Sequence, residues 1–390
     1  MEVKRMNEIS VSRRLLGTLS LSALLCILMI NGGLRSPFNN NENFKRYFVT
    51  HVTILDWTTF FGRPLNSTDL RLCPELSCEI TNDRKKLKTS NAVLFHPRDI
   101  EPQDLPAGRP SHLHYVFFLQ ESPHHVNLKL TASNFFTLTM TYRRDSDVHM
   151  PYGWMRRTQK EKTNFSSEEF IEGILLHKRR LVAAFVSNCG PPSGRDTYIR
   201  ALQQYVRVDV YGRCGPLYCP KEQSEKCLSM LRKEYKFILA FENSVCKDYV
   251  TEKVFNALKY NVVPVVLSRR ITEPFLPNGS FIAADDFPTA EELARYLRQL
   301  DNDTEEYLKY FDWLKSYEII GYDDMQSLAF CQLCRLLRDT RSTAVKASRS
   351  AEDIVKWYHV GGNCLINYGK TISGVSPQPT HRIIRSVKRI

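Results

Sequence analysis

Short apolar runs separated by polar loops recur through the first half of the chain. They cover residues 52–57, 92–95, 115–119 and 135–142, and proline-containing loops such as 97–99 and 102–110 lie between them. Apolar runs of this length with turn residues on either side predict β-strands. We therefore expect an N-terminal α/β domain over residues 49–175.

The second half alternates more regularly between apolar runs and amphipathic stretches. Strands are predicted at residues 181–187, 208–211, 237–241 and 262–267, and helices at 195–206, 224–233 and 251–260. Such alternation predicts a parallel sheet with helices on both faces, which binds ligands at the carboxyl ends of its strands. Residues 176–340 are thus predicted to form a second α/β domain.

The end of the chain is less regular. Pro288-Thr289, followed by Glu291 and Glu292, predicts a helix start, and residues 313–337 are predicted to be helical. Residues 341–390 form a C-terminal tail that either packs back as a helix or contacts a membrane or a partner.

The N-terminus carries an uncharged apolar run over residues 15–30, preceded by Lys4, Arg5, Arg13 and Arg14. It is slightly shorter than the ~20 residues that a full bilayer span prefers. No small-residue cleavage site follows it, which favours a transmembrane signal-anchor over a cleaved signal peptide. Because the basic residues precede the run, residues 1–14 are expected to be cytosolic, with the polar stem 31–48 and the rest of the chain in the lumen.

Composition narrows the class of protein. At 390 residues the chain exceeds what one core usually holds, and its 54 basic against 42 acidic residues give a net charge of +12. The basic residues occur singly or in pairs without interleaved aromatic residues, which argues against nucleic-acid binding. Phosphorylated small molecules or an anionic membrane surface remain as partners.

Cysteine usage agrees with a lumenal location. One of the eleven cysteines, Cys26, lies in the apolar run, and the other ten form an even set that predicts disulfides. The close pairs Cys73/Cys78 and Cys331/Cys334 are the expected local bridges, with zinc binding as the weaker alternative. Four glycosylation sequons, at Asn66, Asn164, Asn278 and Asn302, also fit lumenal exposure.

The segment 241–267 is the most informative part of the chain. A predicted strand runs into a polar loop and then into a helix that starts with Thr251, Glu252 and Lys253. Backbone N–H groups and the lysine suit phosphate oxygens, and the glutamate suits sugar hydroxyls. From spacing alone, an ordinary αβ unit with a solvated Glu-Lys pair explains the segment equally well.

This segment resembles the donor-binding signature of the α1,3-fucosyltransferases, glycosyltransferase family 10. Phe-Glu-Asn-Ser at 241–244 and Asp-Tyr-Val-Thr-Glu-Lys at 248–253 carry the resemblance. Three further segments match in order: 117–123, 138–153, and 186–189 with Gly194-Arg195. Together they cover roughly residues 50–335 and leave the stem and the tail outside.

The resemblance implies a GT-B fold, in which two Rossmann-like domains face each other across a cleft. Residues 49–175 would bind the acceptor and residues 176–340 would bind GDP-β-L-fucose. Glu121, at the end of a predicted strand, is the implied general base of an inverting transfer. The implied donor-binding residues are Val186, Ser187, Asn188, Arg195, Asn243, Tyr249, Glu252 and Lys253. Arg195 and Lys253 would stabilise the charge of the leaving diphosphate.

Asp145-Ser146-Asp147 imitates a metal-binding Asp-x-Asp motif. The preceding Arg143 and Arg144 favour a structural ion-pair network over a metal site. We therefore expect no required cofactor, with Mn²⁺ or Mg²⁺ at most stimulating the reaction.

The acceptor is the least determined part of the prediction. Cys246, Cys189 and Cys214 give the chain the look of the invertebrate and plant enzymes that fucosylate the N-glycan core. A Lewis-type enzyme acting on lactosamine antennae is one alternative, and a non-catalytic lectin-like or scaffold protein of the same fold is another. The resemblance implies a single-pass type II protein of the Golgi membrane, anchored by residues 15–30. The sequence does not address its oligomeric state.

Overall fold

The computed structural model describes residues 51–108, 110, 112–126, 135–159, 168–175, 177–220, 223–339 and 351–374. The predicted cytosolic segment, membrane anchor and stem lie outside these residues, as does the sequon at Asn164. Within the described part of the chain, no helix combines the length and apolar character needed to cross a membrane. The other three sequon asparagines, Asn66, Asn278 and Asn302, are exposed.

The first half forms a six-stranded sheet in the order β2-β1-β3-β4-β5-β6, with every neighbouring pair parallel. Its strands are β1 (Val52–Asp56), β2 (Cys78–Thr81), β3 (Ala92–Phe95), β4 (His114–Leu119), β5 (Leu138–Thr141) and β6 (Val148–His149). Short 3₁₀ turns occupy the connections, at Ser67–Leu70, Arg84–Thr89, Pro102–Asp104 and Pro123–His125. The four strands predicted in this half are confirmed, whereas the short β2 and β6 were not predicted.

The second half forms a five-stranded parallel sheet in the order β12-β11-β10-β8-β9. Its strands are β8 (Arg180–Phe185), β9 (Val208–Tyr211), β10 (Tyr235–Leu239), β11 (Val263–Val266) and β12 (Ile282–Ala283). The helices of this half are α2 (Glu168–Leu175), α3 (Arg195–Leu202), α4 (Ser224–Glu234), α5 (Glu252–Lys259), α6 (Arg269–Thr272), α7 (Ala290–Asn302) and α8 (Thr304–Lys309). The predicted strand and helix alternation, and the parallel sheet it implies, are confirmed.

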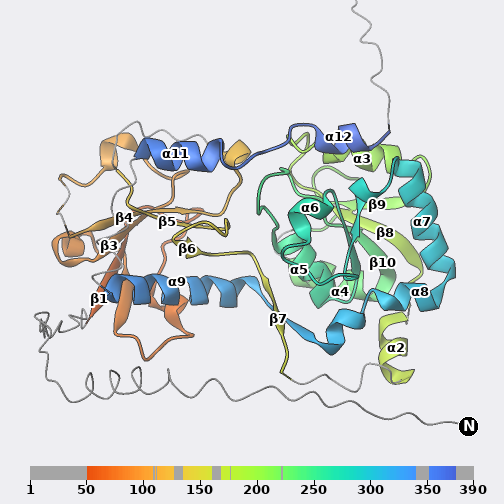
Figure 1. Cartoon of the computed structure of the whole chain (residues 1–390), viewed down its shortest axis with the longest axis horizontal. Coiled ribbons are helices and arrows are strands. Elements are labelled where there is room, and N and C mark those ends of the chain that lie inside the picture. Colours follow the sequence, from red (N-terminus) through yellow and green to blue (C-terminus); the bar gives the residue numbers. More distant parts are fainter. Residues whose placement is uncertain are drawn as a thin grey trace, which may run out of the picture. The chain divides into compact units, whose positions relative to one another are not determined.

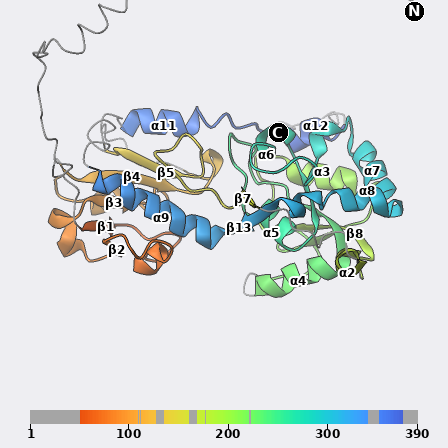
Figure 2. The same cartoon turned by 60° about the horizontal axis from the view of Figure 1, so that its bottom comes forward.

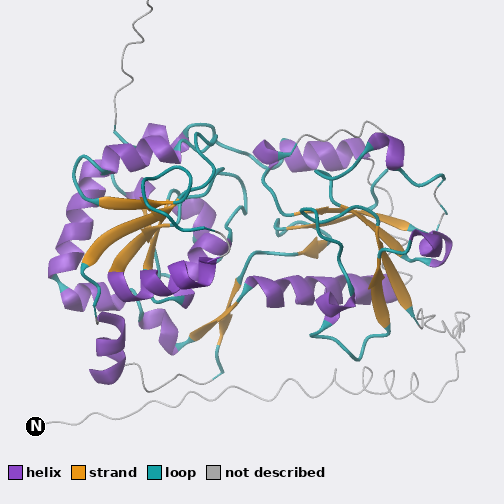
Figure 3. Cartoon of the chain, turned by 180° about the vertical axis from the view of Figure 1, so that it is seen from behind, coloured by secondary structure: helices purple, strands orange, loops and turns teal. Residues whose placement is uncertain are grey.

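Both sheets are covered on both faces, which explains why their strands read as continuous apolar runs. On the second sheet, α3 and α7 pack against one face, while α4 and α5 pack against the other. Figure 2 shows α3 and α4 on opposite sides of this sheet, and Figure 3 shows both sheets surrounded by helices.

The first sheet is covered by helices from the far end of the chain. Helix α9 (Tyr322–Arg338) contributes Phe330 and Leu333 to the core on one face, and α11 (Ala351–His359) contributes Ile354 and Tyr358 on the other. Figure 1 shows these two blue helices on either side of the orange strands. The chain then continues to α12 (Tyr368–Ile372), which packs against α3. The described part of the tail, residues 351–374, thus packs back with two helices, which is one of the two outcomes left open by the sequence.

The prediction of one helix over residues 313–337 is wrong in its first part. A 3₁₀ turn at Asp312–Lys315 is followed by the strand β13 (Tyr317–Ile320), which pairs antiparallel with β7 (Trp154–Arg157). Tertiary pairing with β7 decides the conformation here, since Ile319 and Ile320 are β-branched and suit a strand. Helix α9 begins only at Tyr322.

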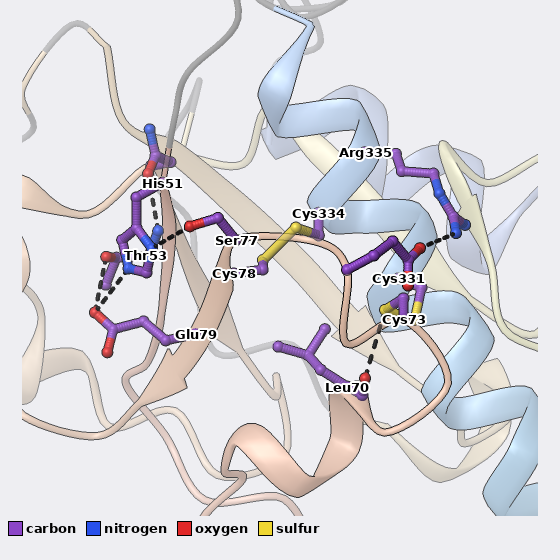
Figure 4. Close-up of a disulfide and its surroundings, with 12 residues drawn as sticks. His51, Thr53, Leu70, Cys73, Ser77, Cys78, Glu79, Cys331, Cys334 and Arg335 are labelled. Carbon is purple, nitrogen blue, oxygen red and sulfur yellow. Dashed lines mark hydrogen bonds and ion pairs between the residues drawn. A yellow bond between two sulfur atoms is a disulfide. The ribbon is translucent and has the colours of Figure 1, made fainter.

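The two predicted local disulfides are also wrong. Cys73 bonds to Cys331 and Cys78 bonds to Cys334, with Cα–Cα distances of 6.0 and 6.3 Å. Because Cys331 and Cys334 lie three residues apart on α9, both face the edge of the first sheet, where the other two cysteines lie (Figure 4). The remaining bridges are Cys189–Cys214, Cys219–Cys227 and Cys246–Cys364, so all ten predicted cysteines are paired.

Candidate active site

A cavity of about 520 Å³ lies at the carboxyl ends of the strands of both sheets. From the first half of the chain it is lined by Phe61, Glu121 and Tyr152. From the second half it is lined by seven predicted residues: Ser187, Asn188, Arg195, Asn243, Tyr249, Glu252 and Lys253. Eight of the nine predicted site residues therefore share one cavity.

Val186 is the exception. Its side chain is 4% exposed and belongs to the core of the second sheet. Its backbone is still important for the cavity wall, because its N–H donates to Tyr211 and its carbonyl accepts from Cys214. Val186 therefore holds the Ser187-Asn188 loop without lining the cavity.

Glu121 follows β4 by two residues and projects into the cavity from the first sheet. Its carboxylate lies 3.3 Å from the guanidinium of Arg98, in the loop after the neighbouring strand β3. Burial raises the pKa of Glu121, and the positive charges of Arg98 and Lys253 offset this only in part. A carboxylate with a raised pKa is a better proton acceptor than a solvated one, as a general base requires.

Lys253 lies in the first turn of α5, within a cluster of acidic and hydroxyl groups. Its Nζ lies 2.9 Å from Glu242 Oε2, 2.7 Å from Thr251 Oγ1 and 3.3 Å from Glu252 Oε1. Burial alone would lower the pKa of Lys253, but Glu242 and Glu252 outweigh it and raise the pKa. Lys253 is therefore a fixed positive charge, 25% exposed, in the cavity wall.

Glu242 orders the start of α5 as well as the lysine. It accepts hydrogen bonds from both the N–H and the hydroxyl of Thr251, each at 2.8 Å. Glu252 lies beside it with a more exposed carboxylate, whose pKa burial would raise but the charge of Lys253 lowers. Glu252 is thus an ionised acceptor available to hydroxyl groups of a ligand.

Arg195 opens α3 and is 3% exposed. Its two terminal nitrogens donate to the carbonyl of Phe241 at 2.7 Å and to that of Asn188 at 2.9 Å. Burial lowers its pKa, while Glu242 and Asp196 raise it. Arg195 therefore joins the loops that follow β8 and β10, and places a buried positive charge at the cavity.

The loop between β10 and α5 is held from the first half of the chain. Asp248, at φ +61°, is 4% exposed and accepts from the N–H of Arg144 at 3.2 Å and from its Nε at 3.0 Å. The next residue, Tyr249, packs edge-on against Tyr142 with ring centroids 5.0 Å apart. This loop also carries Asn243, whose buried Oδ1 has no hydrogen-bond partner among the described residues.

The Asp145-Ser146-Asp147 motif forms a structural network. Asp145 makes a two-pronged ion pair with Arg143, at 2.9 and 2.7 Å, and a second pair with Lys247 at 2.9 Å. Asp147 instead accepts from the backbone and hydroxyl of Thr139. The predicted ion pairing is confirmed for Arg143, whereas Arg144 pairs with Asp248.

Residues that were not predicted also shape the site, among them Phe61 and Tyr152 in the cavity wall, Arg98 beside Glu121 and Glu242 beside Lys253. Glu242 could have been found, because it directly follows a predicted strand whose carboxyl end meets the site. Arg98 could not, because its contact with Glu121 depends on β3 and β4 being neighbours in the sheet. Phe61, 48% exposed at φ +52°, carried no signal in the sequence. Tyr152, whose hydroxyl donates to the carbonyl of Gln120, lies in the matching segment 138–153, but no role was predicted for it.

The cavity thus places one carboxylate of raised pKa opposite two cations and an ionised glutamate. This set of groups suits a displacement on a ligand that carries both hydroxyl groups and an anionic leaving group. Fold and site together fit a group-transfer enzyme.

Comparison with known families identifies the class further. Residues 50–153 match the family described as "Fucosyltransferase, N-terminal", and residues 175–357 match "Glycosyltransferase family 10 (fucosyltransferase) C-term". The chain therefore belongs to glycosyltransferase family 10, the fucosyltransferases.

Several characterised relatives are similar over most of the chain. The human "4-galactosyl-N-acetylglucosaminide 3-alpha-L-fucosyltransferase FUT6" is 39% identical over 298 residues, which cover 73% of this chain and 79% of that protein. The Drosophila melanogaster "Glycoprotein 3-alpha-L-fucosyltransferase A" is 37% identical, over 75% of this chain and 56% of that protein. The Caenorhabditis elegans "Alpha-(1,3)-fucosyltransferase fut-1" is 34% identical, over 73% of this chain and 64% of that protein.

A solved structure described as "Crystal Structure of alpha1,3-Fucosyltransferase with GDP-fucose" is 17% identical, with a TM-score of 0.46. The match covers 74% of this chain and 90% of that chain.

Proposed function

We propose that this chain transfers L-fucose from GDP-β-L-fucose, in α1,3 linkage and with inversion, to an N-acetylglucosamine of glycoprotein glycans. One observation carries the proposal: Glu121 comes from the first sheet into the same cavity as Arg195, Glu252 and Lys253 from the second. In the GT-B arrangement that we infer for the two sheets, the first would hold the acceptor and the second the donor. The names of the relatives support the transferred sugar and the linkage.

The proposed reaction is a single displacement at the anomeric carbon. The acceptor O3 attacks that carbon while Glu121 takes the proton from the hydroxyl, and the bond from the anomeric carbon to the diphosphate oxygen breaks. GDP leaves with the bonding electron pair, and Lys253 and Arg195 stabilise its charge. Attack opposite the leaving group converts the β-linked donor into an α-linked product.

The other contacts of the donor follow from the cavity wall. Glu252 would accept hydrogen bonds from fucose hydroxyls, and Ser187 and Asn188 would support the diphosphate beside the start of α3. Asn243 offers the buried amide oxygen described above, and Tyr249 lies beside Glu252 in the same wall. No metal is needed in this scheme, because two fixed cations serve the leaving group.

The N-glycan core is our proposed acceptor, with lactosamine antennae as the alternative. The fly relative is named for action on glycoproteins and the human relative for action on a galactosyl-N-acetylglucosaminide, and their identities of 37% and 39% favour neither. Our preference rests on Cys246, Cys189 and Cys214, which give the chain its resemblance to the invertebrate and plant enzymes that act on the core. Cys189 pairs with Cys214 in the donor half, and Cys246 pairs with Cys364 of the tail.

We also propose that the protein is a type II protein of the Golgi membrane, anchored by residues 15–30. The five disulfides support an oxidising lumen for the described part of the chain. Carbonate extraction should leave the full chain in the membrane, and removal of residues 1–48 should release it.

The acceptor is tested with purified protein and a panel of donors and acceptors. GDP-fucose, GDP-mannose and UDP-galactose are each offered with a core N-glycan and with N-acetyllactosamine, and products are measured by mass spectrometry. We expect transfer from GDP-fucose alone, with the core glycan as the better acceptor. Faster transfer to lactosamine would identify a Lewis-type enzyme, and GDP binding without any transfer would support the non-catalytic alternative.

A further inference from the structure

A segment near the C-terminus contacts three loops that border the candidate active site. Residues 357–369, which we call the C-terminal strap, run from the end of α11 to the start of α12 (Figure 1). The family match ends at residue 357, so nearly all of the strap lies beyond it. Its contacts reach the loop after β4, the loop between β10 and α5, and the start of α3.

The first contact is with the loop that carries Glu121. Tyr358 is fully buried, and its hydroxyl donates a hydrogen bond to the backbone carbonyl of Glu121. Its ring packs edge-on against Phe117 of β4, with ring centroids 5.2 Å apart. Tyr358 therefore holds both the strand and the residue that carries the proposed base.

Close packing fixes the beginning of the strap. Any Cβ at Gly361 would lie 2.4 Å from the carbonyl oxygen of Trp357 and within 3.3 Å of the guanidinium of Arg143. Any Cβ at Gly362 would lie 2.8 Å from Pro123, two residues after Glu121. Both positions need glycine because the backbone at the end of α11 leaves no room for a Cβ, and at Gly362 the side chain of Pro123 leaves none on the other side.

The middle of the strap is bonded to the donor signature. Cys364 forms a disulfide with Cys246, and the carbonyl of Gly362 accepts from the N–H of Lys247 at 2.7 Å. The N–H of Leu365 donates to the carbonyl of Val245 at 2.8 Å. One covalent and two hydrogen bonds thus join the strap to residues 245–247, just before Tyr249.

The end of the strap covers the loop before Arg195. The N–H of Asn367 donates to the carbonyl of Pro192 at 2.6 Å, and that of Gly369 donates to the carbonyl of Ser193 at 2.8 Å. Any Cβ at Gly369 would lie 2.8 Å from the carbonyl oxygen of Gly194. The strap and the start of α3 are therefore in backbone contact.

We propose that the strap sets the position of Glu121 relative to the donor-binding cations, with Tyr358 as the positioning residue and the Cys246–Cys364 disulfide as its anchor. This inference rests on the proposed function, because it concerns the geometry of the transfer step. A shift of about 1 Å between reacting groups lowers a rate by about 100-fold. A hydrogen bond that does not involve the strap also joins the loop of Glu121 to the donor signature. The hydroxyl of Ser122 donates to that of Ser244 at 2.8 Å.

The first test compares two tyrosines with matched environments. Tyr307 is also fully buried, and its hydroxyl donates to the carbonyl of Lys236, in the core of the second half. We expect Tyr358→Phe to lower kcat by about 10-fold while the KM for GDP-fucose and the affinity for GDP stay within twofold. Both variants lose one buried hydrogen bond, so we expect them to lower the melting temperature by similar amounts. Tyr307→Phe should nevertheless keep the wild-type kcat.

The second test compares two disulfides that close long loops, of 118 and 256 residues. Replacing Cys246 and Cys364 by serine should lower kcat and also raise the KM for GDP-fucose, because the strap anchors the donor signature. Replacing Cys78 and Cys334 by serine should lower the melting temperature with kcat unchanged. All kcat values are calculated per GDP-binding site, so that misfolded protein, which does not bind GDP, does not lower them.

The outcomes separate the inference from the proposed function. A wild-type chain that binds GDP but transfers no fucose contradicts the proposed function. An active wild type whose Tyr358→Phe and Cys246→Ser/Cys364→Ser variants keep full kcat per site overturns the role of the strap. A fall in kcat that is equal in the Tyr307→Phe and Tyr358→Phe variants also overturns it, since it would reflect general loss of packing.

Discussion

The candidate roles of Glu121 and Lys253 follow from their positions, one after the end of a strand and the other at the start of a helix. Glu121 follows β4 of the first sheet, and Lys253 lies in the first turn of α5, which follows β10 of the second sheet. Both residues line the cavity at the carboxyl ends of the strands. The sequence could predict these positions because strand ends and helix starts are local features. It could not predict Arg98 beside Glu121, because that contact depends on β3 and β4 being neighbours.

The proposed role of Glu121 as general base predicts a loss of turnover without a loss of binding. In Glu121→Gln the amide cannot take the acceptor proton, so kcat should fall by ~10²–10⁴. The affinity for GDP, measured by calorimetry, should stay nearly unchanged. Glu291→Gln, at an exposed position of α7, serves as the control. Wild-type turnover in Glu121→Gln would remove Glu121 from the mechanism.

The raised pKa of Glu121 predicts the pH dependence of the reaction. A base must be ionised, so kcat/KM should fall as the pH falls through the pKa of Glu121, which burial raises above its ordinary value of 4.5. Arg98 lowers that pKa, and Arg98→Gln removes its charge. The acid limb of the profile should therefore move to higher pH in the variant. A limb that stays in place or moves to lower pH would contradict the pairing.

At the level of elements, the sequence predicted those strands and helices whose pattern is continuous and local. It failed for β13, since pairing with β7 outweighs the helical character of the flanking residues. It also failed for the disulfides of α9. Cys331 and Cys334 lie on the same side of the helix, and each bonds to a cysteine of the first half of the chain and not to the other. In both cases the deciding partner lies more than 150 residues away in the chain.

The turn after β5 predicts an effect on stability. Arg143 is 1% exposed, and Asp145→Asn would remove the carboxylate that neutralises it. We expect a loss of about 1–3 kcal/mol of unfolding free energy and a melting temperature lower by several degrees, with the GDP affinity retained. The loss is smaller than for a fully buried pair, because Asp145 is 41% exposed.

A surface ion pair provides the matched control. Arg335 and Glu75 are 55% and 63% exposed, and Glu75→Gln should change the unfolding free energy by less than about 1 kcal/mol. A stable but inactive Asp145→Asn variant, alongside a wild type that EDTA inactivates and Mn²⁺ restores, would instead favour a metal site at this motif.

For the whole molecule, the sequence predicted two α/β halves. It did not predict that helices from the end of the chain pack on the first half. Helices α9 and α11 cover the two faces of the first sheet although they follow the second sheet in the sequence. Amphipathic pattern shows that a helix has a buried face, but it does not show which sheet that face meets. The strap between α11 and α12 carried no motif, and only its spatial contacts give it a role.

The proposed stabilisation of the leaving group by Lys253 and Arg195 predicts that transfer does not depend on a metal ion. Activity should survive EDTA, and Mn²⁺ should stimulate it only modestly. Lys253→Met should weaken GDP binding and slow transfer together, because it removes a charge-assisted contact worth about 1.5–3 kcal/mol. Activity abolished by EDTA and restored by Mn²⁺ would contradict this assignment.

The most direct test of the central claim is the stereochemistry of the product. Purified chain is incubated with GDP-β-L-fucose and a core N-glycan in EDTA, and the new linkage is determined by NMR. The account predicts an α-fucosyl residue on O3 of N-acetylglucosamine, formed by the wild type and nearly absent with Glu121→Gln. A β-linked product, or equal product from the Glu121→Gln variant, would contradict a single inverting displacement with Glu121 as its base.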